Sequence, residues 1–250
     1  MGDLEPLRCD GFLGGTLRLW QPARGYRSGA DAVLLAAACP AQAGDAVLEL
    51  GCGAGVAALC LAARVPGIRA TGLEVQPAYA ALARRNAAEN ALMLEVIEAD
   101  LTALPADLRA RNFDAVITNP PYFRAATLPP DAGRGLARHE ALPLTLWLDA
   151  GLRRLRPGGS LTVIQRAERL GEILAALAPR AGAVRVLPVA ARAGREAGRV
   201  IVTATKGARA PLRLLAPLVM HEGDRHATDG DDHSPLANAI LRNAAPIRYE

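Results

Sequence analysis

The sequence predicts an α/β fold: a doubly wound, mainly parallel sheet of seven strands that ends in an antiparallel strand. Short apolar runs alternate along the chain with alanine- and leucine-rich helical stretches, and a glycine-rich turn joins the first strand to the first core helix. With 250 residues and 51% apolar side chains, the chain is long enough for one well-buried domain. We therefore expect a single domain over residues 1–250.

Each element has its own local signal. The seven strands are expected at 46–50, 69–73, 93–98, 113–118, 160–165, 184–189 and 199–205. Core helices are expected at 56–64, 76–90, 142–155 and 167–178. Gln76-Pro77 opens the second of these helices, because proline suits a first helical turn, and Arg156-Pro157-Gly158-Gly159 turns the chain into the fifth strand. The last two strands are joined by 190–198, which is short enough for a hairpin.

Three sequence features are expected at the carboxyl edge of the sheet, where doubly wound folds bind ligands. Gly51, Gly53 and Gly55 carry no Cβ, so their backbone can turn tightly and approach a ligand. Glu74 ends the second strand, where a carboxylate can accept the hydroxyls of a ribose, and Asp100 follows the third strand. The alternative is that the glycines serve only the turn and that the two acids are helix caps or solvated strand ends.

The tetrapeptide Asn119-Pro120-Pro121-Tyr122 follows the strand at 113–118 directly. The prolines cannot continue the strand, which leaves the Asn119 carboxamide and the Pro120 carbonyl available as hydrogen-bond acceptors beside an aromatic ring. Such a site suits an amino group on a flat ring, whereas the plain alternative is a surface Asn-Pro turn.

Charge and cysteine content indicate which partners and which cellular compartment to expect. The chain has 29 basic and 25 acidic residues, a net charge of +4, which is compatible with a polyanionic partner. Arginine clusters could contact phosphates or form solvated faces; they are Arg84-Arg85, Arg153-Arg154-Arg156 and Arg192-Arg195-Arg199. The cysteines form no C-x-x-C pair, and no leader or apolar run of about 18 residues is present, so a cytoplasmic protein without a membrane span is expected.

The C-terminal stretch 207–250 is expected to be a tail. Its segments 221–226 and 231–233 contain histidine and acidic residues, but their spacing fits no zinc pattern, so we predict no metal site and interpret them as a mobile polar stretch.

Together, Val47 to Gly55, Glu74, Asp100 and the Asn-Pro-Pro-Tyr motif resemble S-adenosylmethionine-dependent methyltransferases that act on amino nitrogens. This family implies a Rossmann-like, class I methyltransferase fold over 46–206. Within it, three outer motifs, at 21–35, 137–140 and 194–207, resemble the bacterial tRNA1(Val) (adenine(37)-N6)-methyltransferases.

The resemblance implies specific roles. The catalytic residues would be Asn119, Pro120, Pro121 and Tyr122. The residues that bind S-adenosylmethionine would be Arg27, Asp31, Glu49, Gly51, Cys52, Gly53, Gly55, Glu74, Val75, Asp100, Leu101 and Asn119. Arg27 and Asp31, in the extension 1–40, would belong to a segment that closes over the cofactor's amino-acid end; a surface Arg27 and a helix cap by Asp31 are the alternatives.

The implied reaction is methylation of an adenine N6 in a tRNA anticodon loop. The adenine N6 lone pair is delocalised into the ring, so two acceptors that take its hydrogens would raise its nucleophilicity, and Tyr122 would stack on the base. The same motif serves enzymes that methylate a release-factor glutamine or a ribosomal RNA guanine N2, and these remain open. We expect tRNA as the partner and no obligate protein partner.

Overall fold

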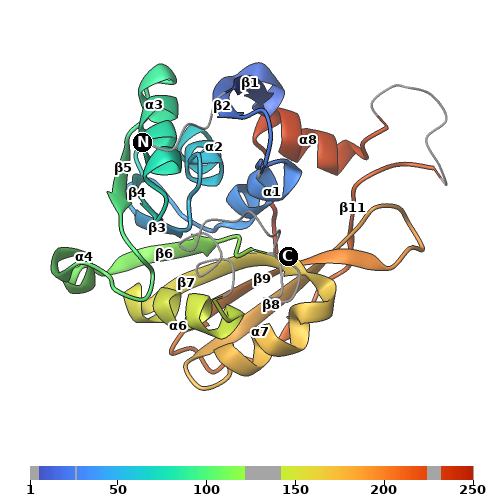
Figure 1. Cartoon of the computed structure of the whole chain (residues 1–250). Coiled ribbons are helices and arrows are strands. Elements are labelled where there is room, and N and C mark those ends of the chain that lie inside the picture. The colour runs from blue at the N-terminus through green and yellow to red at the C-terminus, as the bar shows by residue number, and fades with distance from the viewer. Residues whose placement is uncertain (1–5, 26, 122–141, 224–231, 250) are drawn as a thin grey trace.

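The computed structural model describes residues 6–25, 27–121, 142–223 and 232–249. A central sheet lies between two layers of helices (Figure 1). The sheet strands are β3 (Ala46–Leu50), β4 (Arg69–Glu74), β5 (Leu94–Glu98), β6 (Phe113–Thr118), β7 (Leu155–Arg166), β8 (Ala181–Ala190), β9 (Ala197–Lys206), β10 (Arg213–Leu214) and β11 (Leu218–Val219).

The strand order is β10-β8-β9-β7-β6-β3-β4-β5, with β11 also paired to β8. Strands β3 to β7 are parallel, and β9 runs antiparallel to both β7 and β8. The predicted fold class is thus confirmed, including the seven main strands; β10 and β11 are two-residue additions. The turn expected at 156–159 lies inside β7, because Phe113 pairs with Leu155 and Ala115 with Ser160, so the pairing skips the turn.

Helices cover both faces of the sheet. The helices are α1 (Ala30–Ala38), α2 (Val56–Arg64), α3 (Pro77–Glu89), α4 (Ala106–Ala110), α6 (Leu144–Arg154), α7 (Leu170–Leu177) and α8 (Pro235–Asn243), with 3-10 turns η1 (Leu13–Gly15) and η3 (Ala167–Arg169). Helices α1, α2, α3 and α8 enclose one apolar core, and α4, α6 and α7 enclose the other. No helix in the described part of the chain is long and apolar enough to cross a membrane.

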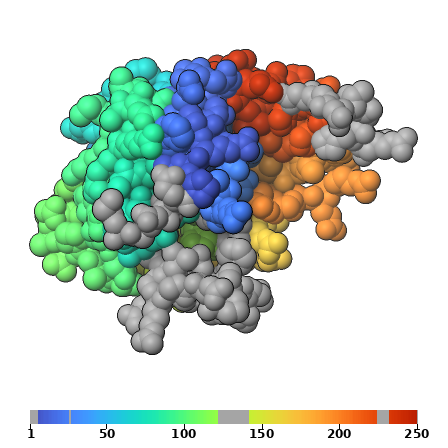
Figure 2. Space-filling view, turned by 45° about the horizontal axis from the view of Figure 1, so that its top comes forward, coloured from blue at the N-terminus to red at the C-terminus, as the bar shows by residue number. Residues whose placement is uncertain are grey.

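An N-terminal hairpin that the sequence did not predict packs on α3. It consists of β1 (Leu7–Phe12) and β2 (Leu17–Pro22) and lies between α3 and α8 (Figure 2). The fully buried Asn86 of α3 pairs with the backbone N–H and carbonyl of Trp20, at 2.7 and 2.9 Å, and also donates to the Ala54 carbonyl in the glycine turn. One buried carboxamide therefore ties the hairpin to the glycine turn.

Much of the stretch predicted as a tail contributes to the fold. It contains β10, β11 and α8, and Tyr249 hydrogen-bonds the Ala38 carbonyl at the end of α1. In the polar stretch, Asp232 accepts a hydrogen bond from the buried Arg192 at 2.6 Å and pairs with His221 at 2.7 Å. Asp232 is therefore held against the body by its ion pair with Arg192, a result that the sequence spacing did not indicate. His226 and Asp231 lie outside the described residues.

Candidate active site

The residues predicted to form the site follow four neighbouring strands. The turn at 51–55 follows β3, Glu74 ends β4, Asp100 follows β5, and Asn119 follows β6. Strand β3 lies between β4 and β6 and is parallel to both, and Leu50 is in register with Leu73 and Thr118. These segments therefore meet at one edge of the sheet. Tyr122 and residues 137–140 lie outside the described residues.

The glycine turn is packed on one side and open on the other. Gly51 has a φ of +68°, and a Cβ there would lie only 2.7 Å from the ring of the buried Trp147 of α6. Gly53 has a φ of +54°, and a Cβ there would meet nothing within 4 Å among the described residues. Open space above a backbone without side chains is the shape that a bound cofactor requires.

Glu74 holds this turn in place. Its carboxylate is nearly buried, and it accepts hydrogen bonds from the Gly53 N–H at 2.8 Å and the Gln76 N–H at 2.9 Å. Each carboxylate oxygen has further lone pairs, so these bonds leave capacity for ribose hydroxyls. The structure thus adds a role that was not predicted, because Glu74 fastens the glycine turn to the end of β4.

Glu49 lies beneath the turn and caps α2. Its carboxyl group accepts a hydrogen bond from the Ala58 N–H at 2.8 Å, in the first turn of that helix. Burial raises the pKa of Glu49 to about 8; the Ala58 bond lowers it in part, and the nearby Glu74 adds to the rise. Near neutral pH this side chain therefore favours its protonated form.

A Glu49→Gln variant should become more stable than the wild type as the pH rises. Below about pH 4.5 the folded and unfolded states both carry a neutral Glu49. Between that value and about pH 8 only the unfolded state loses the proton, so the wild type loses stability, on the order of a few kcal/mol by pH 9. Glutamine keeps an acceptor for Ala58 and carries no charge. Urea unfolding from pH 5 to 9 measures the difference, with Glu98→Gln at an exposed position as the control. Parallel pH curves for wild type and Glu49→Gln would contradict it.

The remaining cofactor candidates differ in accessibility. Asp100 Oδ1 accepts hydrogen bonds from the backbone N–H and the hydroxyl of Thr102, both at 2.7 Å, in a local turn. Leu101 and Cys52 are buried, and burial raises the pKa of the Cys52 thiol well above its usual value. Val75 is half-buried. Cys52 and Leu101 therefore contribute buried apolar surface beneath this edge of the sheet, and Asp100 contributes a carboxylate.

Arg27 and Asp31 bind other parts of the chain. Arg27 pairs with Asp10 of β1 at 2.6 Å, and Asp31, in the first turn of α1, pairs with Arg199 of β9 at 3.0 Å. Asp31 is therefore not the helix cap that was the alternative prediction, since Gly29 occupies that position. The first ion pair joins two parts of the N-terminal extension, and the second connects the extension to β9.

The Asn119-Pro120-Pro121 turn presents two hydrogen-bond acceptors, of which one has a partner among the described residues and the other has none. Asn119 Oδ1 is buried and has no hydrogen-bond partner among the described residues. The Pro120 carbonyl accepts a hydrogen bond from Gln165 Nε2 at 3.2 Å. Gln165 is fully buried near the end of β7, and no motif in the sequence indicated its role, because the two residues lie 45 positions apart. A buried acceptor without a partner is costly unless a ligand supplies the donor.

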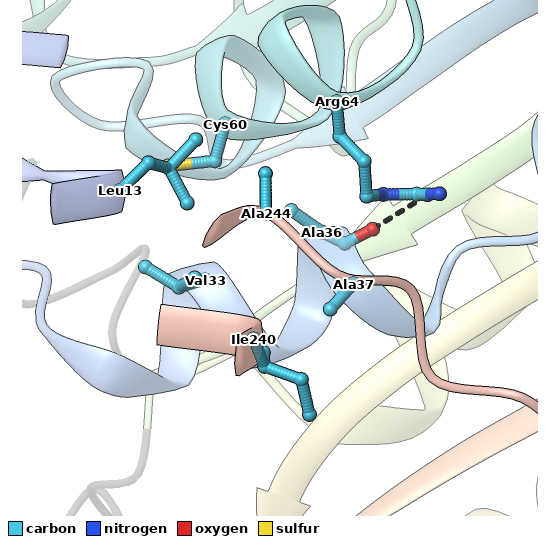
Figure 3. A pocket seen from close by; sticks show the side chains of 8 residues that line it. All are labelled: Leu13, Val33, Ala36, Ala37, Cys60, Arg64, Ile240 and Ala244. Atoms are coloured by element: carbon cyan, nitrogen blue, oxygen red, sulfur yellow. Dashed lines mark hydrogen bonds between the residues drawn. The ribbon is translucent and has the colours of Figure 1, made fainter. Parts of the chain in front are cut away.

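A small apolar crevice lies elsewhere, between α1, α2 and α8 (Figure 3). Arg64 lines it and donates to the Ala36 and Cys39 carbonyls at 2.9 and 2.6 Å, which satisfies the end of α1. Burial lowers the pKa of Arg64. Because its polar groups serve a helix end, we assign this crevice to packing.

Comparisons with known proteins agree with this geometry. Residues 29–187 match the model of the methyltransferase small domain family. A tRNA1(Val) (adenine(37)-N6)-methyltransferase from Porphyromonas gingivalis is 35% identical over 59% of this chain, and the match spans 61% of that protein. A protein of the same name from Dickeya chrysanthemi is 30% identical over 88% of this chain and 90% of its own length.

Among solved structures, a predicted O-methyltransferase from Agrobacterium tumefaciens is 32% identical, with a TM-score of 0.70 over 87% of this chain and 98% of its own. These matches support S-adenosylmethionine as the cofactor, as the sequence predicted. The chain belongs to the methyltransferase small domain family.

Proposed function

We propose that the protein transfers the methyl group of S-adenosylmethionine to the exocyclic N6 of an adenine in a tRNA anticodon loop. The observation that carries this proposal is the buried Oδ1 of Asn119, which has no hydrogen-bond partner in the described part of the chain and lies next to the Pro120 carbonyl. Two acceptors match the two hydrogens of a planar amino group. A hydroxyl group has a single hydrogen, so a substrate methylated on oxygen would leave one of the two hydrogen-bond acceptors without a donor.

The cofactor side fits the same proposal. The open backbone at Gly53 would lie under the methionine part of the cofactor, Glu74 would accept the ribose hydroxyls, and Asp100 would meet the adenine amine. The bound cofactor supplies a methyl group on a sulfonium, which is a good leaving group. The protein therefore has to position the amine and needs no strong general base.

On the acceptor side, Asn119 Oδ1 and the Pro120 carbonyl would each take one N6 hydrogen. These bonds would raise the electron density on the nitrogen. As its lone pair bonds to the methyl group and the bond from that methyl to sulfur breaks, positive charge would pass to the amine, where the two fixed oxygen acceptors stabilise it without reorganising. The methylated amine would then release one proton to solvent. Tyr122, which is proposed to stack on the base, would hold it against the two acceptors. A loop nucleotide is already unpaired, so moving its base out of the stack costs little.

The choice of adenine in tRNA draws on the named relatives and on the net charge of +4. Glutamine amides and the guanine N2 group have the same planar NH₂, so the two acceptors alone do not separate them from adenine. The relatives named tRNA1(Val) (adenine(37)-N6)-methyltransferases favour the nucleobase.

Incubation with methyl-labelled S-adenosylmethionine and unmodified total tRNA, followed by nucleoside mass spectrometry, tests the proposal. N6-methyladenosine located in an anticodon loop is the expected product. A parallel incubation with an unmodified release factor and with ribosomal RNA covers the other planar amines. Label in the release factor, in N2-methylguanosine or in an O-methylated nucleoside, with no N6-methyladenosine, would overturn it.

A further inference from the structure

The carboxamide of Gln165 is held at both ends. Nε2 donates to the Pro120 carbonyl at 3.2 Å, and Oε1 accepts from the backbone N–H of Arg166 at 2.9 Å. A backbone N–H can only donate, so it selects Oε1 and leaves Nε2 for Pro120. The side chain is fully buried, and Gln165 lies in β7 opposite Val200 of β9. Its amide group thus has one orientation, set by a central strand.

The Pro120 carbonyl needs such a partner for a reason that lies in the sequence. Pro121 has no N–H, so the peptide group between the two prolines has its carbonyl as its only hydrogen-bonding handle. A carbonyl oxygen has two lone pairs, and Gln165 occupies one of them. The other stays available for a substrate hydrogen, in a direction fixed by the Gln165 bond.

We propose that Gln165 is a positioning residue, which orients the Pro120 carbonyl so that it and Asn119 Oδ1 meet the two hydrogens of the target amine together. This inference rests on the proposed amine methylation, and it holds for any planar amine. Gln165 acts through Pro120 and touches no substrate. Without the Gln165 side chain, the Pro120 carbonyl would still be present but would no longer be held in one orientation. A misplacement of about 1 Å can lower a rate about 100-fold.

Gln165→Met tests the donor, since methionine has a similar length and no N–H. We expect kcat to fall about 10- to 100-fold, while the dissociation constant of S-adenosylhomocysteine, measured by calorimetry, changes less than about 3-fold. Thr162→Val is the matched control. Thr162 is also fully buried on β7, and its hydroxyl has no hydrogen-bond partner among the described residues, so its removal should leave kcat unchanged.

Gln165→Glu tests whether Gln165 orients the Pro120 carbonyl or only supports the structure around it. A neutral glutamic acid keeps both bonds, because one oxygen carries a proton for Pro120 and the other accepts from Arg166. An ionised carboxylate would instead repel the Pro120 carbonyl. We expect kcat of this variant to approach the wild-type value at low pH and to fall as the carboxyl group ionises, a loss absent from the wild-type profile. If Gln165→Met does not fold, this profile alone decides.

The outcomes distinguish the two proposals. Wild-type methylation of tRNA adenine with an unchanged kcat in Gln165→Met, or a pH profile of Gln165→Glu that follows the wild type, would overturn the role of Gln165 only. Wild-type methylation of a protein glutamine with a lowered kcat in Gln165→Met would overturn the tRNA proposal only. No transfer to any planar amine would overturn both.

Discussion

Asn119→Ala is expected to lower the rate of methyl transfer by about 100- to 1,000-fold. The substitution removes Oδ1, the buried acceptor that has no partner among the described residues. The amine would then meet only the Pro120 carbonyl, so one hydrogen would be left without an acceptor as charge builds on the nitrogen. Single-turnover rates with saturating cofactor measure this loss directly.

Binding of S-adenosylhomocysteine to Asn119→Ala should stay within about 3-fold of the wild type, because Asn119 is proposed to act mainly on the acceptor amine. Asn112→Ala, at an exposed position just before β6, is the control and should leave both quantities unchanged. If Asn119→Ala mainly weakened cofactor binding, Asn119 would belong to the cofactor side of the site and the proposed chemistry would lose its first acceptor.

Gly51→Ala and Gly53→Ala are expected to fail in different ways. Both backbones have positive φ, so alanine costs about 1 to 2 kcal/mol of strain at either position. Only at Gly51 would the new Cβ collide with Trp147, at 2.7 Å, and overpacking adds about 1 to 3 kcal/mol. Urea unfolding should therefore show a larger loss of stability for Gly51→Ala.

Cofactor affinity, in contrast, should be lowered by Gly53→Ala. Gly53→Ala keeps most of its stability but places a methyl group in the open space proposed for the cofactor, so S-adenosylhomocysteine should bind at least about 10-fold more weakly. Calorimetry on the folded variants measures this. If folded Gly53→Ala bound the ligand as tightly as the wild type, the cofactor would not pass over Gly53.

Elements with strong local signals were predictable. The strand Phe113–Thr118 ends one residue before a proline pair, and the strand Ala46–Leu50 is followed by a glycine, so the hydrophobic pattern and the backbone restriction agree on both boundaries. The hairpin β1–β2 was missed because part of its support comes from Asn86, more than 60 residues away. The C-terminal α8 was not predicted because it follows a stretch rich in histidine and acidic residues, and its short apolar face is explained only by its packing on α1.

The sequence by itself determined the order of the seven main strands and of helices α2, α3, α6 and α7 along the chain, the edge at which the glycine turn, Glu74, Asp100 and Asn119 meet, and the family resemblance. These properties depend on residues close together in the chain or on general rules for parallel sheets. Only the tertiary structure decided that Arg27 binds Asp10, that Asp31 binds Arg199, and that Gln165 holds the Pro120 carbonyl. Hydrogen bonds between separate elements depend on register and side-chain direction, which leave no periodic pattern in the sequence.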